Sequence, residues 1–264
     1  ARSVGATSLA ALRALPPNTL LQATRPQHSD ADVDLDGWFL REPPAHTMEE
    51  GRQAQVPLLL GSNSQEDYYT SLLKDRPPTP ENYRAALQRV FGAQAERALA
   101  LYPGGNDAQV KQSATALAGD FFIAHSTWRW MDLQWHHGHA PVYFYYFAQP
   151  RPAKQQPDPG EQAAPGAVHS GEIEFALGNL DSNHVYAWTP ADQHTSQTME
   201  GYFANFIKTG NPNGTGLPNW PAVRESDGGI LRQLIATHTA TEVDRGAARQ
   251  AFLTQFFKDH TGPL

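Results

Sequence analysis

The strongest constraint on the fold is a pair of short apolar runs with a long stretch of helix-forming sequence between them. Residues 56–60 (VPLLL) form one run, and residues 141–147 (PVYFYYF) form a second one rich in aromatic and β-branched side chains. Such runs are typical of strands that are buried on both faces. Two strands joined through helices make the crossover that a parallel sheet requires. The sequence therefore predicts an α/β fold with a mainly parallel central sheet flanked by helices.

The residues between the two runs carry helix signals. Thr79 and Pro80 are a good helix start, with threonine as the cap and proline in the first turn. We expect helices over residues 80–91 and 93–101 and a longer helix from about residue 107 to 135. Elsewhere the spacing of apolar residues predicts helices over residues 8–15, 195–208 and 245–258 and an edge strand over residues 230–235.

Composition excludes several classes of protein. The net charge of the 264 residues is -7 with no basic cluster, which argues against a nucleic-acid partner. There is no cysteine, so disulfides and thiol catalysis are excluded, and no apolar run is long enough to span a membrane. The acidic stretch at residues 30–37 lacks the last ligand of a calcium loop, and we interpret it as a solvated turn. No metal or cofactor is predicted, and the cellular compartment stays open.

Each predicted strand leads into a loop with chemically useful side chains. The loop after the first strand holds Glu66 and Asp67, and the loop beyond the second places His169 between glycines. Reacting groups gather at the carboxyl ends of parallel strands. A histidine can take the proton of a serine hydroxyl and return it to a leaving group, while a carboxylate on its other ring nitrogen sets the tautomer. His169 is therefore the predicted base, whereas Glu172 and Glu174 beside it are interpreted as structural partners.

Three segments resemble the type B carboxylesterases, a family of α/β-hydrolases that includes bacterial para-nitrobenzyl esterases and the cholinesterases. Residues 56–67 (VPLLLGSNSQED) resemble the acid loop of the family, residues 166–180 (GAVHSGEIEFALGNL) its histidine loop, and residues 203–221 (FANFIKTGNPNGTGLPNWP) its Gly-x-Pro-Asn region before a Trp-Pro. The resemblance covers nearly the whole chain. It implies that residues 1–264 are the C-terminal portion of a single α/β-hydrolase domain.

The resemblance also implies roles for two residues. Glu66 matches the triad acid and His169 the triad base. The family usually has glycine directly after the acid, where this chain has Asp67. Asp67 therefore stays open as the alternative partner of the histidine.

The nucleophile of such a triad is missing from the sequence. We find neither a Gly-x-Ser-x-Gly motif nor an HGGG-like run for an oxyanion hole, and in the family both precede the acid. We therefore expect a second polypeptide, the N-terminal half of the same hydrolase, produced by proteolytic nicking or as a separate chain. The expected function is a serine-dependent carboxylic ester hydrolase that acts on a small-molecule ester through an acyl-enzyme. The alternative is a non-catalytic, cholinesterase-like binding module.

Overall fold

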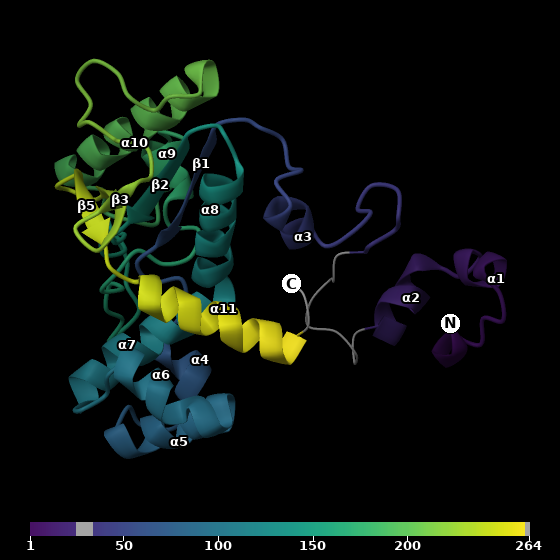
Figure 1. Ribbon diagram of the computed structural model, residues 1–264. Helices are drawn as coiled ribbons and strands as arrows, with labels where there is room; N and C mark the ends of the chain where they lie inside the picture. The colour runs from purple at the N-terminus through teal and green to yellow at the C-terminus, as the bar shows by residue number, and fades with distance from the viewer. Residues whose placement is uncertain (25–33, 262–264) are drawn as a thin grey trace. The chain divides into compact units, whose positions relative to one another are not determined.

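The computed structural model describes residues 1–24 and 34–261 (Figure 1). The chain divides into two compact units, Ala1–Pro43 and Pro44–Leu264. The larger unit holds the sheet and both strand-end loops, so the site is built there. Of the acidic stretch expected as a solvated turn, residues 30–33 lie outside the described residues.

The sheet of the larger unit contains both predicted strands, β1 (Leu58–Asn63) and β2 (Val142–Phe147). They pair in parallel, as the crossover predicts, and β2 pairs in parallel with β4 (Gly229–Ile235) on its other side. Two more strands, β3 (Glu225–Ser226) and β5 (Ala240–Asp244), run antiparallel to β4. The sheet is therefore mixed rather than mainly parallel.

The strand expected at an edge lies inside the sheet, because β4 has neighbours on both sides. The short turns that join β4 to β3 and to β5 explain this position. Asp227 and Gly228 both have positive φ, 46° and 78°, which is the geometry of a tight two-residue hairpin between β3 and β4. A short link from β4 to β5 likewise forces antiparallel pairing.

The helices between β1 and β2 follow the prediction closely. Helices α5 (Pro80–Phe91) and α6 (Ala95–Leu101) lie where expected. The long helix is α7 (Asp107–Gly119) and α8 (His125–His137), joined by a π-helical segment over Asp120–Ala124. The remaining helices of this unit are α3 (Pro44–Glu49), α4 (Tyr69–Leu73), α9 (Ile173–Ala176), α10 (Pro190–Thr209) and α11 (Ala247–Thr261).

Helices cover both faces of the sheet, with α8 on one side and α9 and α10 on the other (Figure 1). The side chains of β2 alternate between the two cores, since Phe144 packs with Met131 of α8 while Phe147 packs with Phe175 of α9. Such burial on both faces is what the unbroken apolar run predicts. It also holds the end of β2, and with it the start of the histidine loop, in a fixed place.

Helix α10 begins before the predicted residue 195 because a capping box starts it. The Thr189 hydroxyl accepts a hydrogen bond from the Asp192 backbone N–H at 3.3 Å, and the Asp192 carboxylate accepts one from the Thr189 backbone N–H at 2.9 Å. Thr189→Ala is expected to lower the free energy of unfolding by about 1 kcal/mol. Thr189→Ser keeps the hydroxyl and serves as the control in urea denaturation. Equal stabilities for the two variants would contradict this role.

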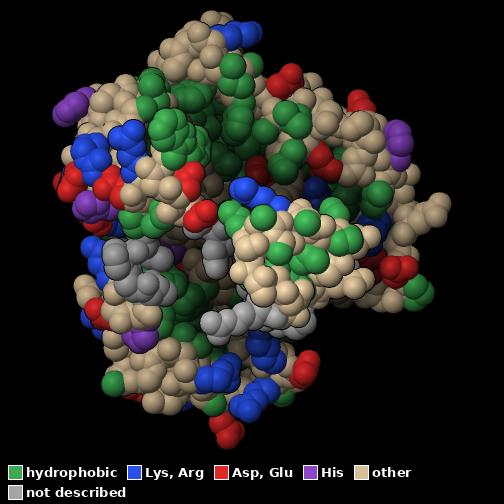
Figure 2. All heavy atoms as spheres, turned by 90° about the vertical axis from the view of Figure 1, so that its right-hand side faces the viewer, with side chains coloured by type: hydrophobic (Ala, Val, Ile, Leu, Met, Phe, Trp, Pro, Cys, Tyr) green, Lys and Arg blue, Asp and Glu red, His purple; other side chains and the backbone are tan. Residues whose placement is uncertain are grey.

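Large apolar side chains remain exposed on the larger unit. They are Val56, Tyr68, Phe122, Trp130, Ile173, Leu177, Val185 and Ile207. Figure 2 shows apolar side chains gathered over the upper part of the face that it displays, with charged groups beside them. Apolar side chains that gather in this way on one face often mark an interaction site.

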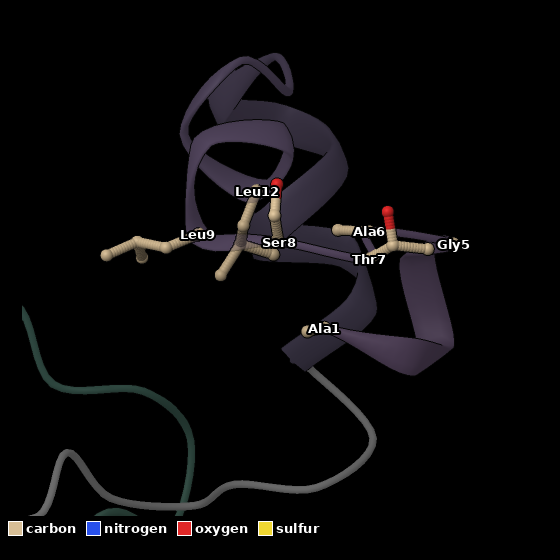
Figure 3. Close-up of a pocket in the computed structure, with 7 residues that line it drawn as sticks. All are labelled: Ala1, Gly5, Ala6, Thr7, Ser8, Leu9 and Leu12. Atoms are coloured by element: carbon tan, nitrogen blue, oxygen red, sulfur yellow. The ribbon is translucent and has the colours of Figure 1, made fainter.

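The smaller unit contains a 3-10 helix (Arg2–Val4), α1 (Leu9–Arg13) and α2 (Pro17–Thr24). The first predicted helix is thus present, capped by the Ser8 hydroxyl, which accepts from the Ala11 N–H at 3.1 Å. This unit has a hollow, shown in Figure 3, lined by Ala1, Gly5, Ala6, Thr7, Ser8, Leu9 and Leu12. None of these side chains is acidic, basic or imidazole, so the hollow offers no side chain for acid–base chemistry.

Candidate active site

The central contact of the site joins the two strand-end loops. The Glu66 Oε2 atom lies 2.7 Å from the His169 Nδ1 atom, across 103 residues of sequence. The other carboxylate oxygen, Oε1, accepts a hydrogen bond from the Asn63 backbone N–H at 2.6 Å. The Glu66 side chain is only 7% exposed. Because both oxygens are held, the carboxylate has one defined orientation toward the ring.

The imidazole of His169 is more open than its partner. Its side chain is 45% exposed. Since Nδ1 is bonded to Glu66, the nitrogen left for proton transfer is Nε2. Among residues 1–24 and 34–261, the one aromatic ring in contact with this imidazole is that of Phe122, whose centroid lies 4.8 Å away at an interplanar angle of 78°. The arrangement combines a buried acid with an accessible base.

Backbone and side-chain hydrogen bonds join the acid loop to the histidine loop. The Gln65 N–H donates to the Ala167 carbonyl at 2.9 Å, and the Ala167 N–H donates to the Ser64 hydroxyl at 2.9 Å. The Asn63 side-chain amide donates to the Val168 carbonyl at 2.8 Å and to the Glu172 carboxylate. Each residue preceding Glu66 in its loop is therefore tied to the segment that carries His169.

A second set of contacts holds the residues after the histidine. Arg151 donates from Nε to the Glu174 carboxylate at 3.0 Å and from Nη2 to the Ser170 carbonyl at 3.4 Å. The Asn183 amide donates to the same carboxylate. Glu172 and Glu174 thus both have structural partners, as the sequence indicates. Neither is hydrogen-bonded to the imidazole.

The structure distinguishes the two acids that the sequence left open. The Asp67 Oδ1 atom accepts hydrogen bonds from the Tyr68 backbone N–H at 2.7 Å and from the Ser71 hydroxyl at 2.6 Å. Asp67 therefore stabilises the start of α4, while Glu66 contacts the ring.

A buried tyrosine lies near the acids. Burial raises the pKa of Tyr145 in β2, and the negative charges of Glu172 and Glu66 raise that pKa further. Its phenol stays neutral near pH 7 and is no candidate base.

In residues 1–24 and 34–261 we find no group of three or more side chains arranged to hold a metal ion. No helix in these ranges is long and apolar enough to cross a membrane.

The model of the carboxylesterase family matches residues 2–251. The chain belongs to the carboxylesterase family. The resemblance inferred from three motifs is therefore confirmed. Among curated relatives, carboxylesterase 5A of Canis lupus familiaris is 30% identical over 83% of the chain, and the para-nitrobenzyl esterase of Bacillus subtilis (strain 168) is 30% identical over 72%.

Solved structures support the α/β-hydrolase fold of this chain. A thermophilic PNB esterase matches 96% of the chain with a TM-score of 0.68 at 23% identity. Another PNB esterase structure matches 94% with a TM-score of 0.65 at 25% identity. The chain spans 40% and 37% of the lengths of the two curated relatives and about half of each solved structure. The α/β architecture with helices on both sides of the sheet is confirmed.

Ser170 has an unusual backbone conformation next to the imidazole. Its φ of 60° lies in the left-handed region. Ser170→Val is expected to lower the free energy of unfolding by about 1–2 kcal/mol, because a β-branched side chain is strained there. Ser170→Gly fits the same backbone and is expected to keep the stability of the wild type. Chemical denaturation checks the pair, and a valine variant as stable as the glycine variant would contradict the expectation.

Asn63 was not singled out from the sequence. It lies inside the recognised acid loop, but its residue type alone does not indicate that it bonds to both the acid and the histidine loop. For Phe122 the sequence leaves two interpretations open, a pocket-lining residue and core packing. Its side chain is 54% exposed, which argues against core packing. Contacts of this kind depend on tertiary structure and leave no local signal.

Proposed function

We propose that this chain supplies the acid and the base of a serine hydrolase triad that cleaves carboxylic esters. Glu66 is the acid and His169 the base. The observation that carries the proposal is the 2.7 Å contact between a buried carboxylate and a half-exposed imidazole in a chain of the carboxylesterase family. Both groups also stand at the carboxyl ends of adjacent parallel strands, where α/β folds place their reacting groups.

The geometry suits acyl transfer in two steps. The oxygen of a serine attacks the ester carbonyl carbon while its proton passes to Nε2 of His169. Glu66 stabilises the imidazolium through Nδ1, and the ring then returns the proton to the departing alkoxide. A water molecule attacks the acyl-serine in the same way, losing its proton to Nε2. The acid is released, and the proton returns to the serine oxygen.

The serine and the oxyanion hole, in this proposal, come from outside residues 1–264, on the N-terminal half of the same hydrolase. The sequence has no Gly-x-Ser-x-Gly motif, and the chain spans 40% of the length of the first relative. In the described part of the sheet β1 is an end strand, so its outer edge offers backbone groups to a further strand. The exposed apolar surface of the larger unit is a second place for that half to cover (Figure 2).

The substrate class follows from the same comparison. One relative is named for para-nitrobenzyl ester cleavage and another, from Rattus norvegicus, for hydrolysis of acylcarnitine. We infer a small-molecule carboxylic ester as the substrate and use p-nitrophenyl acetate as the probe.

Labelling with a fluorophosphonate tests the proposal, because this reagent reacts with a serine only when a triad base activates it. The preparation is the complete hydrolase, with the N-terminal half present. Label is expected on the wild type and on His194→Ala, a control at an exposed histidine of α10, and is expected to be lost in His169→Ala. Equal labelling of the wild type and of His169→Ala would contradict the proposed role of His169 as the base. No label on any form would favour the non-catalytic binding module.

A further inference from the structure

Phe122 is a large apolar side chain that the structure leaves half exposed. Its ring lies against the imidazole of His169, with centroids 4.8 Å apart and planes at 78°. Aromatic rings at this distance and angle attract each other beyond the effect of simple burial. The imidazole is 45% exposed and hydrogen-bonded to Glu66 at Nδ1, so the Phe122 ring packs against a base that solvent reaches.

The backbone that carries Phe122 is not ordinary helix. The π-helical segment Asp120–Ala124 separates α7 from α8 at the point where the helix passes the site. The wider turn changes the direction in which its side chains project compared with an uninterrupted α-helix. Segments of this kind are rare and occur frequently at functional sites. Because a π-helical turn is less favourable than an α-helical one, this segment next to the base needs interactions that hold its conformation.

Asp120, the first residue of the segment, provides them. Its buried carboxylate accepts a hydrogen bond from the Tyr102 hydroxyl at 2.7 Å and one from the Gln250 amide at 3.4 Å. It also forms an ion pair with Arg249, whose Nε lies 3.3 Å away. Burial and the charge of Asp120 raise the pKa of Tyr102, so its phenol remains the donor. These partners lie on α11 and at the end of α6, which anchors the segment from two directions.

The same segment is also close to the acid. Gly119, directly before it, lies beside Glu66: an added Cβ there would be in ordinary van der Waals contact, 3.4 Å from the Glu66 Cβ atom. The helix therefore passes the Glu66 side chain at Gly119 and the His169 ring at Phe122. One anchored stretch of the chain lies next to both members of the pair.

We propose that Phe122, presented by the π-helical segment, is a positioning residue that holds the His169 imidazole in the orientation where Nδ1 faces Glu66 and Nε2 faces the nucleophile. This inference rests on the proposed function. Phe122 acts through the ring and does not touch the reacting atoms. Its removal widens the set of ring orientations, and only one of these transfers the proton.

The test uses the complete hydrolase with p-nitrophenyl acetate and three variants. Phe122→Leu keeps an apolar side chain but removes the aromatic contact, and it is expected to lower kcat by roughly 3- to 10-fold. KM is expected to stay within about 2-fold, since the loss concerns proton transfer. Phe122→Tyr keeps the ring and is expected to restore kcat. Phe39→Leu, the same exchange at an exposed phenylalanine of the smaller unit, is the matched control and is expected to match the wild type.

Several results would overturn the inference. An unchanged kcat in Phe122→Leu, a change confined to KM, or failure of Phe122→Tyr to restore kcat would each do so, the second by making Phe122 a wall of the substrate pocket. Thermal unfolding of each variant shows whether a lower kcat results from unfolding. If kcat falls with the loss of folded protein, whether or not the variant keeps the aromatic ring, the inference is also overturned. If His169→Ala is as active as the wild type, the proposed function fails instead, whatever the Phe122 variants do.

Discussion

Replacing His169 with alanine is expected to abolish ester hydrolysis by the complete enzyme, with a fall in kcat of about 10⁶. Without the imidazole no group in contact with Glu66 can accept the proton of the nucleophile. The carboxylate is only 7% exposed and its Oε1 is already bonded to the Asn63 N–H, so it cannot substitute for the missing base. The measurement is steady-state hydrolysis of p-nitrophenyl acetate.

The control for this substitution is His194→Ala, at an exposed histidine of α10, which is expected to leave kcat unchanged. Because the His169 side chain is itself half exposed, its loss is not expected to unfold the protein, and a matching thermal unfolding curve verifies this. A His169→Ala variant that keeps more than about a tenth of wild-type kcat would be incompatible with any role as general base, which contributes at least about 10².

Glu66→Gln carries the second largest expected effect, a fall in kcat of about 10⁴. The amide oxygen of glutamine can still accept the Asn63 N–H, which leaves the amide NH₂ facing His169 Nδ1. That arrangement places the ring proton on Nε2, and a protonated Nε2 cannot accept the proton of the serine. The variant is therefore expected to fold normally and to fail in catalysis.

Asp67→Asn is the matched control for Glu66→Gln, because it neutralises the next acid in the chain. Asp67 bonds to Tyr68 and Ser71 and not to the imidazole, so kcat is expected to change by less than about 3-fold, with at most a small loss of α4 stability. A kcat in Asp67→Asn as low as in Glu66→Gln would reverse the assignment of the acid.

Sequence reasoning predicted the parts of the fold whose signal is local. The runs at residues 56–60 and 141–147 predicted β1 and β2, because a strand that is buried on both faces has a continuous apolar sequence. The start of α5 followed from its threonine cap and first-turn proline. Strand β5 was missed because its sequence ATEVD is short and half polar, and without it the interior position of β4 was hidden.

The candidate site could be predicted from the sequence only in part. Glu66 and His169 were predicted as its acid and base because each follows a predicted strand and matches a family motif. Their contact depends on the register of β1 against β2 and on the hydrogen bonds between loops 103 residues apart, which no local pattern records. Phe122 depends further on a π-helical turn, and the sequence around it reads as uninterrupted helix.

The most direct test of the central claim is to find the atom that His169 activates. The complete hydrolase is labelled with a fluorophosphonate and digested, and the modified peptide is identified by tandem mass spectrometry. The account predicts a single adduct on a serine in a Gly-x-Ser-x-Gly sequence outside residues 1–264. An adduct on a serine within residues 1–264 would contradict it, because the triad would then be complete without the N-terminal half.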